Sequence, residues 1–366
     1  MAGVFKSGAR FVSSLAVATL LVSAAFAQHY TRTDLTTNSS SVSAAPVIDP
    51  NLVNPWGLSR ATSSPWWVSD NGTGVSTLYN AAGDIIPLVV TIPPPEGAQG
   101  PSAPTGTVHN FTTSFEVAPG LPAIFIFVTE DGTIAGWNPN VNPTEAILKV
   151  SRPERAIYKG CTLAMTAYGP RLYVTNFKTG NVEVYDGRFH RQRMEERFGG
   201  RFDSRNHFVP FGIQNVGGSL VITYAQRSPG SEDENHGPGL GFVRVFDLKG
   251  HLLLRLQHGS FLNAPWGVAL APGDFGPFSH RLLIGNFGDG TIAAFNAFSG
   301  EFEGNVLDES GATLAIDGLW ALSFAGDPAK NGSPTELYFT AGPNDESNGI
   351  FGKLTATATE QRGNAE

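Results

Sequence analysis

Acidic and amide residues recur just after short apolar runs along this chain of 366 residues. Carboxylate and amide oxygens are the ligands that Ca²⁺ prefers, so a ring of such residues around a channel could bind this ion. The residues that could contribute are Asp70, Glu130, Asn176, Asn286 and Asp345. The alternative is turn chemistry, because Asn, Asp and Gly also form tight turns where no metal binds.

The same positions define a wider candidate ligand-binding face. If the apolar runs are strands of up-and-down sheets, the turns that follow the second strand of each sheet share one face. We expect that face to present Asp70, Asn71, Glu130, Asp131, Asn176, Tyr224, Gln226 and Asn286. Tyr224 and Gln226 come just before a long loop, and we expect them to point toward the channel.

Three further features could do chemistry, and each has a simpler explanation. Residues 231–236 form the densest acidic cluster, either an inserted binding loop or a solvated loop. His109 is a candidate base or ligand, although a lone histidine is commonly structural. Cys161, among Leu163 and Ala164, fits a buried apolar residue better than a nucleophile.

An internal repeat indicates the elements that would position these residues. Glycines recur at positions 57, 106, 160, 212, 267 and 318, with spacings of 49, 54, 52, 55 and 51 residues. Each glycine lies in an apolar run, and two or three further runs follow it, separated by turn residues. This pattern predicts an all-β, six-bladed β-propeller with four-stranded blades. The last repeat lacks an outer strand, so we expect residues 30–35 to pair with it and close the ring.

The chain also resembles a known family. The stretches that carry the resemblance are residues 51–58, 130–139, 158–160, 264–267, 285–290 and 337–342. In these stretches the chain is similar to an uncharacterised family of exported, mostly bacterial proteins with NHL-like six-bladed propellers. The resemblance implies the fold and export, and it implies no activity for particular residues.

The chain ends and the overall charge restrict the environment and the partners. Residues 1–27 have a basic start, an uncharged apolar stretch and Ala25-Phe26-Ala27, which together indicate a signal peptide. We therefore expect a propeller over residues 28–354, a polar tail over 355–366, no transmembrane segment in the mature chain, and a periplasmic or extracellular location. The net charge of −8 argues against nucleic-acid binding. We expect a monomer.

Two functions are consistent with these features. The first is a binding or interaction scaffold that uses the polar face and the central channel to hold a small molecule, a glycan or a protein. The second is a Ca²⁺-assisted hydrolase or lyase of lactonase type, an analogy that depends on the fold alone. No catalytic set is evident in the sequence, which favours the scaffold.

Overall fold

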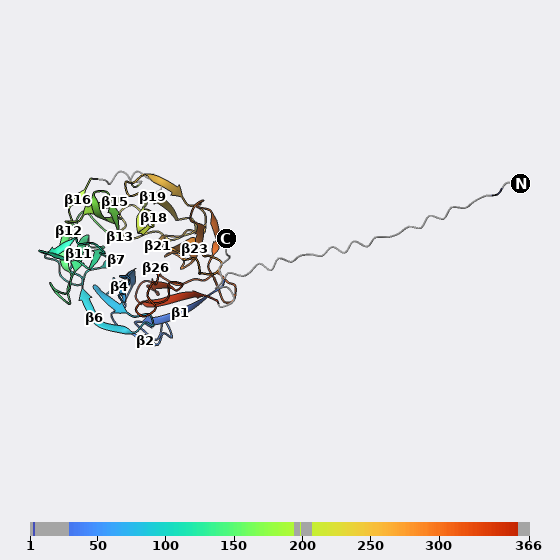
Figure 1. Cartoon of the computed structure of the whole chain (residues 1–366), viewed down its shortest axis with the longest axis horizontal. Coiled ribbons are helices and arrows are strands. Elements are labelled where there is room, and N and C mark those ends of the chain that lie inside the picture. Colours follow the sequence, from blue (N-terminus) through green and yellow to red (C-terminus); the bar gives the residue numbers. More distant parts are fainter. Residues whose placement is uncertain (1–2, 4–28, 194–197, 199–206, 358–366) are drawn as a thin grey trace.

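Six β-sheets stand in a ring around a central axis (Figure 1). This computed structural model describes residues 3, 29–193, 198 and 207–357. The signal peptide expected over residues 1–27 lies outside the described residues apart from Gly3, as do residues 358–366 of the expected tail. The predicted all-β, six-bladed propeller is confirmed.

Each of the first five blades is a four-stranded antiparallel meander whose first strand is innermost. The strands of blade one are β3 (Pro55–Ser59), β4 (Trp66–Asp70), β5 (Val75–Tyr79) and β6 (Ile85–Thr91). Those of blade two are β7 (Pro104–His109), β10 (Phe125–Thr129), β11 (Thr133–Trp137) and β12 (Ile147–Ser151), with a small hairpin of β8 (Glu116–Ala118) and β9 (Leu121–Pro122). Those of blade three are β13 (Tyr158–Thr166), β14 (Gly169–Asn176), β15 (Asn181–Asp186) and β16 (Arg191–Gln192).

The next two blades repeat this order. Blade four consists of β17 (Phe208–Val216), β18 (Ser219–Gln226), β19 (Gly241–Phe246) and β20 (Leu252–Arg255). Blade five consists of β21 (Pro265–Leu270), β22 (Arg281–Asn286), β23 (Ile292–Asn296) and β24 (Phe302–Asn305). Second strands such as β4 and β10 are buried along their whole length, because each blade is packed between two neighbours. Outer strands such as β6 have mostly partly or fully exposed residues.

The two ends of the propeller meet in blade six. Its three C-terminal strands are β26 (Leu319–Phe324), β27 (Leu337–Ala341) and β28 (Ile350–Ala356), and β1 (His29–Thr37) completes it by antiparallel pairing with β28. β2 (Val47–Ile48) and β25 (Leu307–Asp308) add short parallel pairings to β1. The predicted closure by the N-terminal strand is thus observed, and β28 extends two residues beyond position 354.

Glycine lets neighbouring inner strands approach closely. A Cβ on Gly57 would lie 2.3 Å from the carbonyl oxygen of Thr105, and a Cβ on Gly212 would lie 2.1 Å from that of Trp266. No such approach is possible with a side chain present. At these two positions the periodic glycine is therefore a packing requirement.

The repeat in blade six differs from the sequence-based alignment. Leu319 pairs with Ala341 as Pro265 pairs with Asn286, so Ala321, and not Gly318, is the equivalent of Gly267. The last spacing is therefore 54 residues and not 51. Gly318 instead has a φ of +66° in the turn before β26. Because Gly318 lies three residues before Ala321, the glycine pattern assigned it to the ring position.

Over the part of the chain that the structure describes, no helix has the length and apolar character needed to cross a bilayer.

Candidate functional site

In each inner strand, the residue just before the periodic glycine lies near the axis. In blade six it is the residue before Ala321. These residues are Trp56, Thr105, Lys159, Phe211, Trp266 and Trp320. The rings of Trp56 and Trp320 stack at a centroid distance of 3.4 Å, and Trp266 meets Trp56 edge-on at 6.0 Å. Trp266 Nε1 donates to the backbone oxygen of Lys159, from blade five to blade three. The aromatic rings therefore form a plug across the channel.

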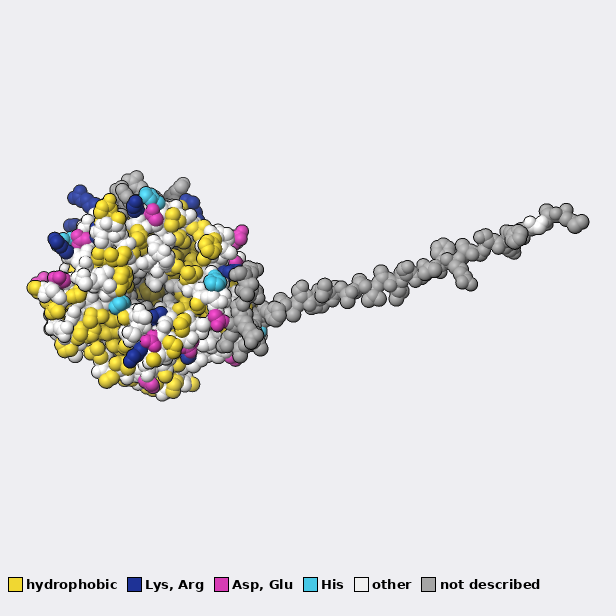
Figure 2. Space-filling model, viewed as in Figure 1, with side chains coloured by type: hydrophobic (Ala, Val, Ile, Leu, Met, Phe, Trp, Pro, Cys, Tyr) yellow, Lys and Arg dark blue, Asp and Glu magenta, His cyan; other side chains and the backbone are white. Residues whose placement is uncertain are grey.

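The channel on one side of this plug is narrow. A cavity of about 40 Å³, enough for roughly one water molecule, is lined by inner-strand residues that include Gly57, Gly106 and Cys161. Figure 2 shows a face of the ring that is hollowed at its centre and bordered by hydrophobic side chains. Burial raises the pKa of the Cys161 thiol, which agrees with a buried apolar role for this residue.

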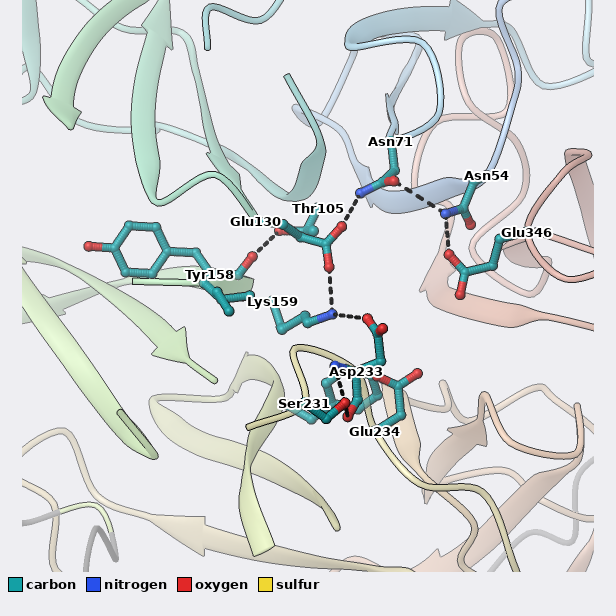
Figure 3. Close-up of polar contacts among 12 residues, drawn as sticks. Asn54, Asn71, Thr105, Glu130, Tyr158, Lys159, Ser231, Asp233, Glu234 and Glu346 are labelled. Carbon is teal, nitrogen blue, oxygen red and sulfur yellow. Dashed lines mark hydrogen bonds and ion pairs between the residues drawn. The ribbon is translucent and has the colours of Figure 1, made fainter. Parts of the chain in front are cut away.

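A buried lysine lies on the other side of the plug. The Lys159 side chain is 1% exposed, and its Nζ lies 5.0 Å from the Trp56 ring centroid and 5.2 Å from that of Phe177. Nζ contacts Glu130 Oε1 at 2.5 Å and Asp233 Oδ1 at 3.8 Å (Figure 3). Burial opposes the charged form, but Glu130 and Glu234 outweigh it and raise the pKa of Lys159. Lys159 is therefore an ammonium at physiological pH.

Polar contacts continue from Lys159 across three blades to blade six. Asn71 Nδ2 donates to Glu130 Oε2 at 2.8 Å, and Asn54 Nδ2 donates to Asn71 Oδ1 at 3.3 Å and to Glu346 Oε2 at 2.5 Å (Figure 3). We call the group formed by Glu130, Lys159, Asp233, Glu234 and Glu346 the charged mouth. It holds four carboxyl groups and one ammonium.

The negative charge of the charged mouth is only partly compensated. The Glu234 side chain is 4% exposed, and its Oε2 has no hydrogen-bond partner among the described residues. Burial, followed by the charges of Glu234 and Glu130, raises the pKa of Glu346 to about 7. His236 Nε2 lies 3.5 Å from Glu234 Oε1, and this contact raises the pKa of His236.

Several predicted site residues stabilise turns. Asp70 is fully buried; its Oδ2 accepts from the backbone N and Oγ1 of Thr77, and burial raises its pKa well above the usual range. Asn176 is also fully buried, and its Nδ2 donates to Arg155 O and Glu183 Oε1.

Asn286 and Asp131 act in the same way. The amide of Asn286 donates to Phe261 O and accepts from the backbone N of Asn263. Asp131 Oδ2 accepts from the backbone N of Ala103 and so holds the connection into blade two.

The two residues expected to point toward the channel are engaged elsewhere. Tyr224 is buried inside blade four, where its hydroxyl donates to Phe198 O and its ring stacks on Phe242. Gln226 Oε1 accepts from Asn235 Nδ2 and holds the base of the long loop. The prediction for Tyr224 was wrong because successive strand residues face opposite sides of a sheet.

The structure replaces two further candidates. Asp345 is exposed, and the next residue, Glu346, reaches the charged mouth. His109 lies at the far end of β7 from Pro104, which pairs with Thr129 beside Glu130. His109 is therefore on the opposite side of the ring from the charged mouth and cannot serve there as a base.

The residues do not fit the candidate Ca²⁺ site. Of the proposed ligands only Glu130 belongs to the charged mouth, and its Oε1 contacts the Lys159 ammonium. Among the described residues, no group of three or more His, Cys, Asp or Glu side chains is arranged to hold a metal ion.

Sequence reasoning placed the charged mouth on the correct face but missed its centre. Asn71 N donates to Asn54 O and Glu130 N donates to Ala103 O, so the second-to-third-strand turns do share a face with the connections between blades. Lys159 and Asn54 were not predicted as site residues, and Asp345 rather than its neighbour Glu346 was the proposed ligand. The sequence did contain a signal for Lys159. The residue just before the periodic glycine is Trp in two other repeats, Trp56 and Trp266, and it is a lysine only in this one.

These features define a class of protein: a six-bladed β-propeller with an aromatic plug and a charged mouth. No family model matches the chain. It is 30% identical over 323 residues to Uncharacterized protein L690 of Acanthamoeba polyphaga mimivirus, an alignment that covers 84% of this chain and 81% of that protein. Uncharacterized protein R648 of the same virus is 29% identical over 327 residues, covering 86% and 78%. The chain belongs to the family of these uncharacterised proteins.

Solved structures are similar in fold. Virginiamycin B lyase from Staphylococcus aureus has a TM-score of 0.51 at 12% identity, with 89% of this chain and 99% of that chain covered. A glucose dehydrogenase has a TM-score of 0.53 at 13% identity, with 90% and 99% covered. At this identity the similarity shows the propeller fold and no shared activity. The expected bacterial and NHL-like character of the family stays a prediction.

Proposed function

We propose that this protein is a ligand-binding propeller whose charged mouth takes a positively charged organic group, an ammonium or a guanidinium. The ligand would be a small molecule or a side chain of a partner. The observation that carries this proposal is charge that is only partly compensated: Glu234 Oε2 is buried with no hydrogen-bond partner among the described residues, and burial beside other carboxylates raises the pKa of Glu346 to about 7. A buried carboxylate oxygen without a hydrogen bond is costly, and a ligand cation that donates to it would reduce that cost.

An organic cation suits the charged mouth better than a metal ion. An ammonium or guanidinium donates hydrogen bonds in several directions, whereas Ca²⁺ needs six to eight oxygens that converge. Phe287 lies beside the site, with its ring 5.1 Å from that of His236 and stacked on Trp320 at 3.8 Å, so the charged mouth borders the aromatic plug. The alternative of a Ca²⁺-assisted hydrolase or lyase has less support, because the expected ligands stabilise turns.

Agmatine, which carries an amine and a guanidinium, is a suitable probe. We expect it to bind one site per chain, with an affinity that rises about fivefold to tenfold from pH 6 to pH 8. The sign follows from the two groups that titrate: Glu346 gains its negative charge as pH rises through about 7, and His236 loses its competing proton. Isothermal titration calorimetry at both pH values would measure the effect.

The variant Glu346→Gln keeps the shape of the side chain and should remove most of this pH dependence. Glu232→Gln is the matched control, because Glu232 is an exposed residue of the same loop as Glu234. Calcium chloride, glucose and glutarate serve as comparison ligands. Equal affinity for agmatine in the wild type and in Glu346→Gln at pH 8, or no binding at all, would rule out the proposal.

We further propose that the protein is exported, as the sequence of residues 1–27 indicates. Cleavage after Ala27 would leave a chain that begins at Gln28, one residue before β1. Expression of the complete chain in a bacterial host should therefore yield mature protein outside the cytoplasm. Intact-mass measurement should show loss of residues 1–27, and a full-length cytoplasmic product would contradict export.

A further inference from the structure

We propose a second ligand site, between blades three and four, that binds a small organic anion with an apolar part. A cavity of about 740 Å³ opens there, within the range of cavities that hold small molecules. We call it the basic cavity, and the residues that carry the argument are Met165, Tyr168, Arg171, Arg193, Asp247 and Lys249.

The charge of the basic cavity favours an anion. Three of its lining side chains, Arg171, Arg193 and Lys249, are basic, whereas the chain as a whole has a net charge of −8. Asp247 is the one lining carboxylate among the described residues, and it is engaged within its own turn. Its Oδ1 accepts from the backbone N of Lys249 and of His251, and its Oδ2 lies 2.8 Å from His251 Nδ1. The basic groups therefore dominate the field inside the cavity.

A neighbouring carboxylate is engaged in the same way. Asp186, which pairs with Arg171 across β14 and β15, accepts through Oδ1 from the backbone N of Arg188 and of His190. Its Oδ2 accepts from Gln192 Nε2 and lies 3.9 Å from His190 Nδ1. Asp186 thus serves the turn that leads into β16.

Apolar side chains at the cavity indicate the rest of the ligand. Tyr168 is 83% exposed and Met165 is 53% exposed, although both line the cavity. The turn that carries Tyr168 is fixed, because Thr166 Oγ1 donates to Gly169 O and accepts from the backbone N of Tyr168. An aromatic ring and a flexible thioether held over a cavity suit an apolar ligand surface.

The walls of the basic cavity belong to both blades and are tied together. The hydroxyl of Tyr173 in β14 donates to Leu248 O in blade four at 2.9 Å. The two sites are also separate. Tyr168 stands at the turn before β14, whereas the charged mouth lies near the other end of that strand, beyond Asn176. The basic cavity can therefore bind a ligand independently of the charged mouth.

8-Anilinonaphthalene-1-sulfonate combines an aromatic body with one sulfonate and is a direct probe. We expect one saturable site per chain in a fluorescence titration of the folded protein at pH 7. Arg171→Gln and Lys249→Gln should each weaken binding about fivefold to tenfold, the loss of one charge-assisted contact. Tyr168→Ser should also weaken binding, because it removes the aromatic ring that contacts the apolar part of the probe. Lys330→Gln, at an exposed site in blade six, should leave it unchanged.

The comparison probe is N-phenyl-1-naphthylamine, which has a similar aromatic body and no charge. Equal affinity for the two probes, or equal effects of Lys249→Gln and Lys330→Gln, would overturn the proposal and indicate unspecific apolar binding. Glu346→Gln should not change sulfonate binding. A failure at the basic cavity would therefore leave the proposal for the charged mouth intact.

Discussion

Lys159→Met should lower the free energy of unfolding at pH 8 by about 3–5 kcal/mol, the usual loss when one partner of a buried ion pair is removed. Methionine keeps most of the length and the apolar contacts of the stem, so the loss reports the charge. Glu130 would lose its ion pair, and Glu234, whose side chain is 4% exposed, would lose the nearby positive charge.

The effect of Lys159→Met should depend on pH in a defined direction. The raised pKa of Lys159 means that its contribution is complete below its ordinary pKa and is lost only in strong alkali. In the variant, the carboxyl groups of the charged mouth repel one another when ionised and are relieved when protonated. The difference from the wild type should therefore be larger at pH 8 than at pH 5. Urea denaturation at both pH values measures it.

Two further variants separate charge from packing. Glu130→Gln keeps the ammonium near Glu234 and Asp233, so it should cost less than Lys159→Met. The double variant should recover part of the loss, because one of the repelling carboxylates is absent. An equal loss for Lys159→Met at pH 5 and pH 8 would show that shape, and not charge, is the contribution of this residue.

Gly212→Ala should have the second large effect. The added methyl group would lie 2.1 Å from the carbonyl oxygen of Trp266 and 2.9 Å from Thr223 Oγ1. Because the first of these atoms is backbone, two inner strands must move apart, and Trp266 is part of the aromatic plug. We expect a loss of about 3 kcal/mol or more, in the range found when a closely packed site is distorted. Thermal unfolding followed by circular dichroism measures it.

Ala321→Gly is the matched control. It changes the equivalent ring position of blade six in the opposite sense and removes one methyl group that the ring already accommodates. The expected loss is about 1 kcal/mol, the usual cost of glycine in regular structure. If Gly212→Ala proved as mild as Ala321→Gly, close strand approach would not explain the periodic glycine.

The fold was largely predictable because it repeats. A glycine about every 50 residues, each followed by apolar runs and turn residues, predicted six blades and the closure by the N-terminal strand. The alignment failed only in blade six, where Ala321 occupies the ring position and Gly318 serves a turn. A pattern of residue types cannot separate these two uses of glycine, because one depends on the neighbouring strand and the other on φ.

The amino-acid sequence alone determined the ring, the acidic character and the face on which polar turns gather. These properties depend on local periodicity and composition. Only the tertiary structure decided which polar residues meet. Asp70 faces the interior while Asn71 reaches Glu130, and Glu346 reaches the charged mouth while Asp345 is exposed. Adjacent residues of a strand or turn point in different directions, and Lys159 meets its partners only because separate blades converge on one axis.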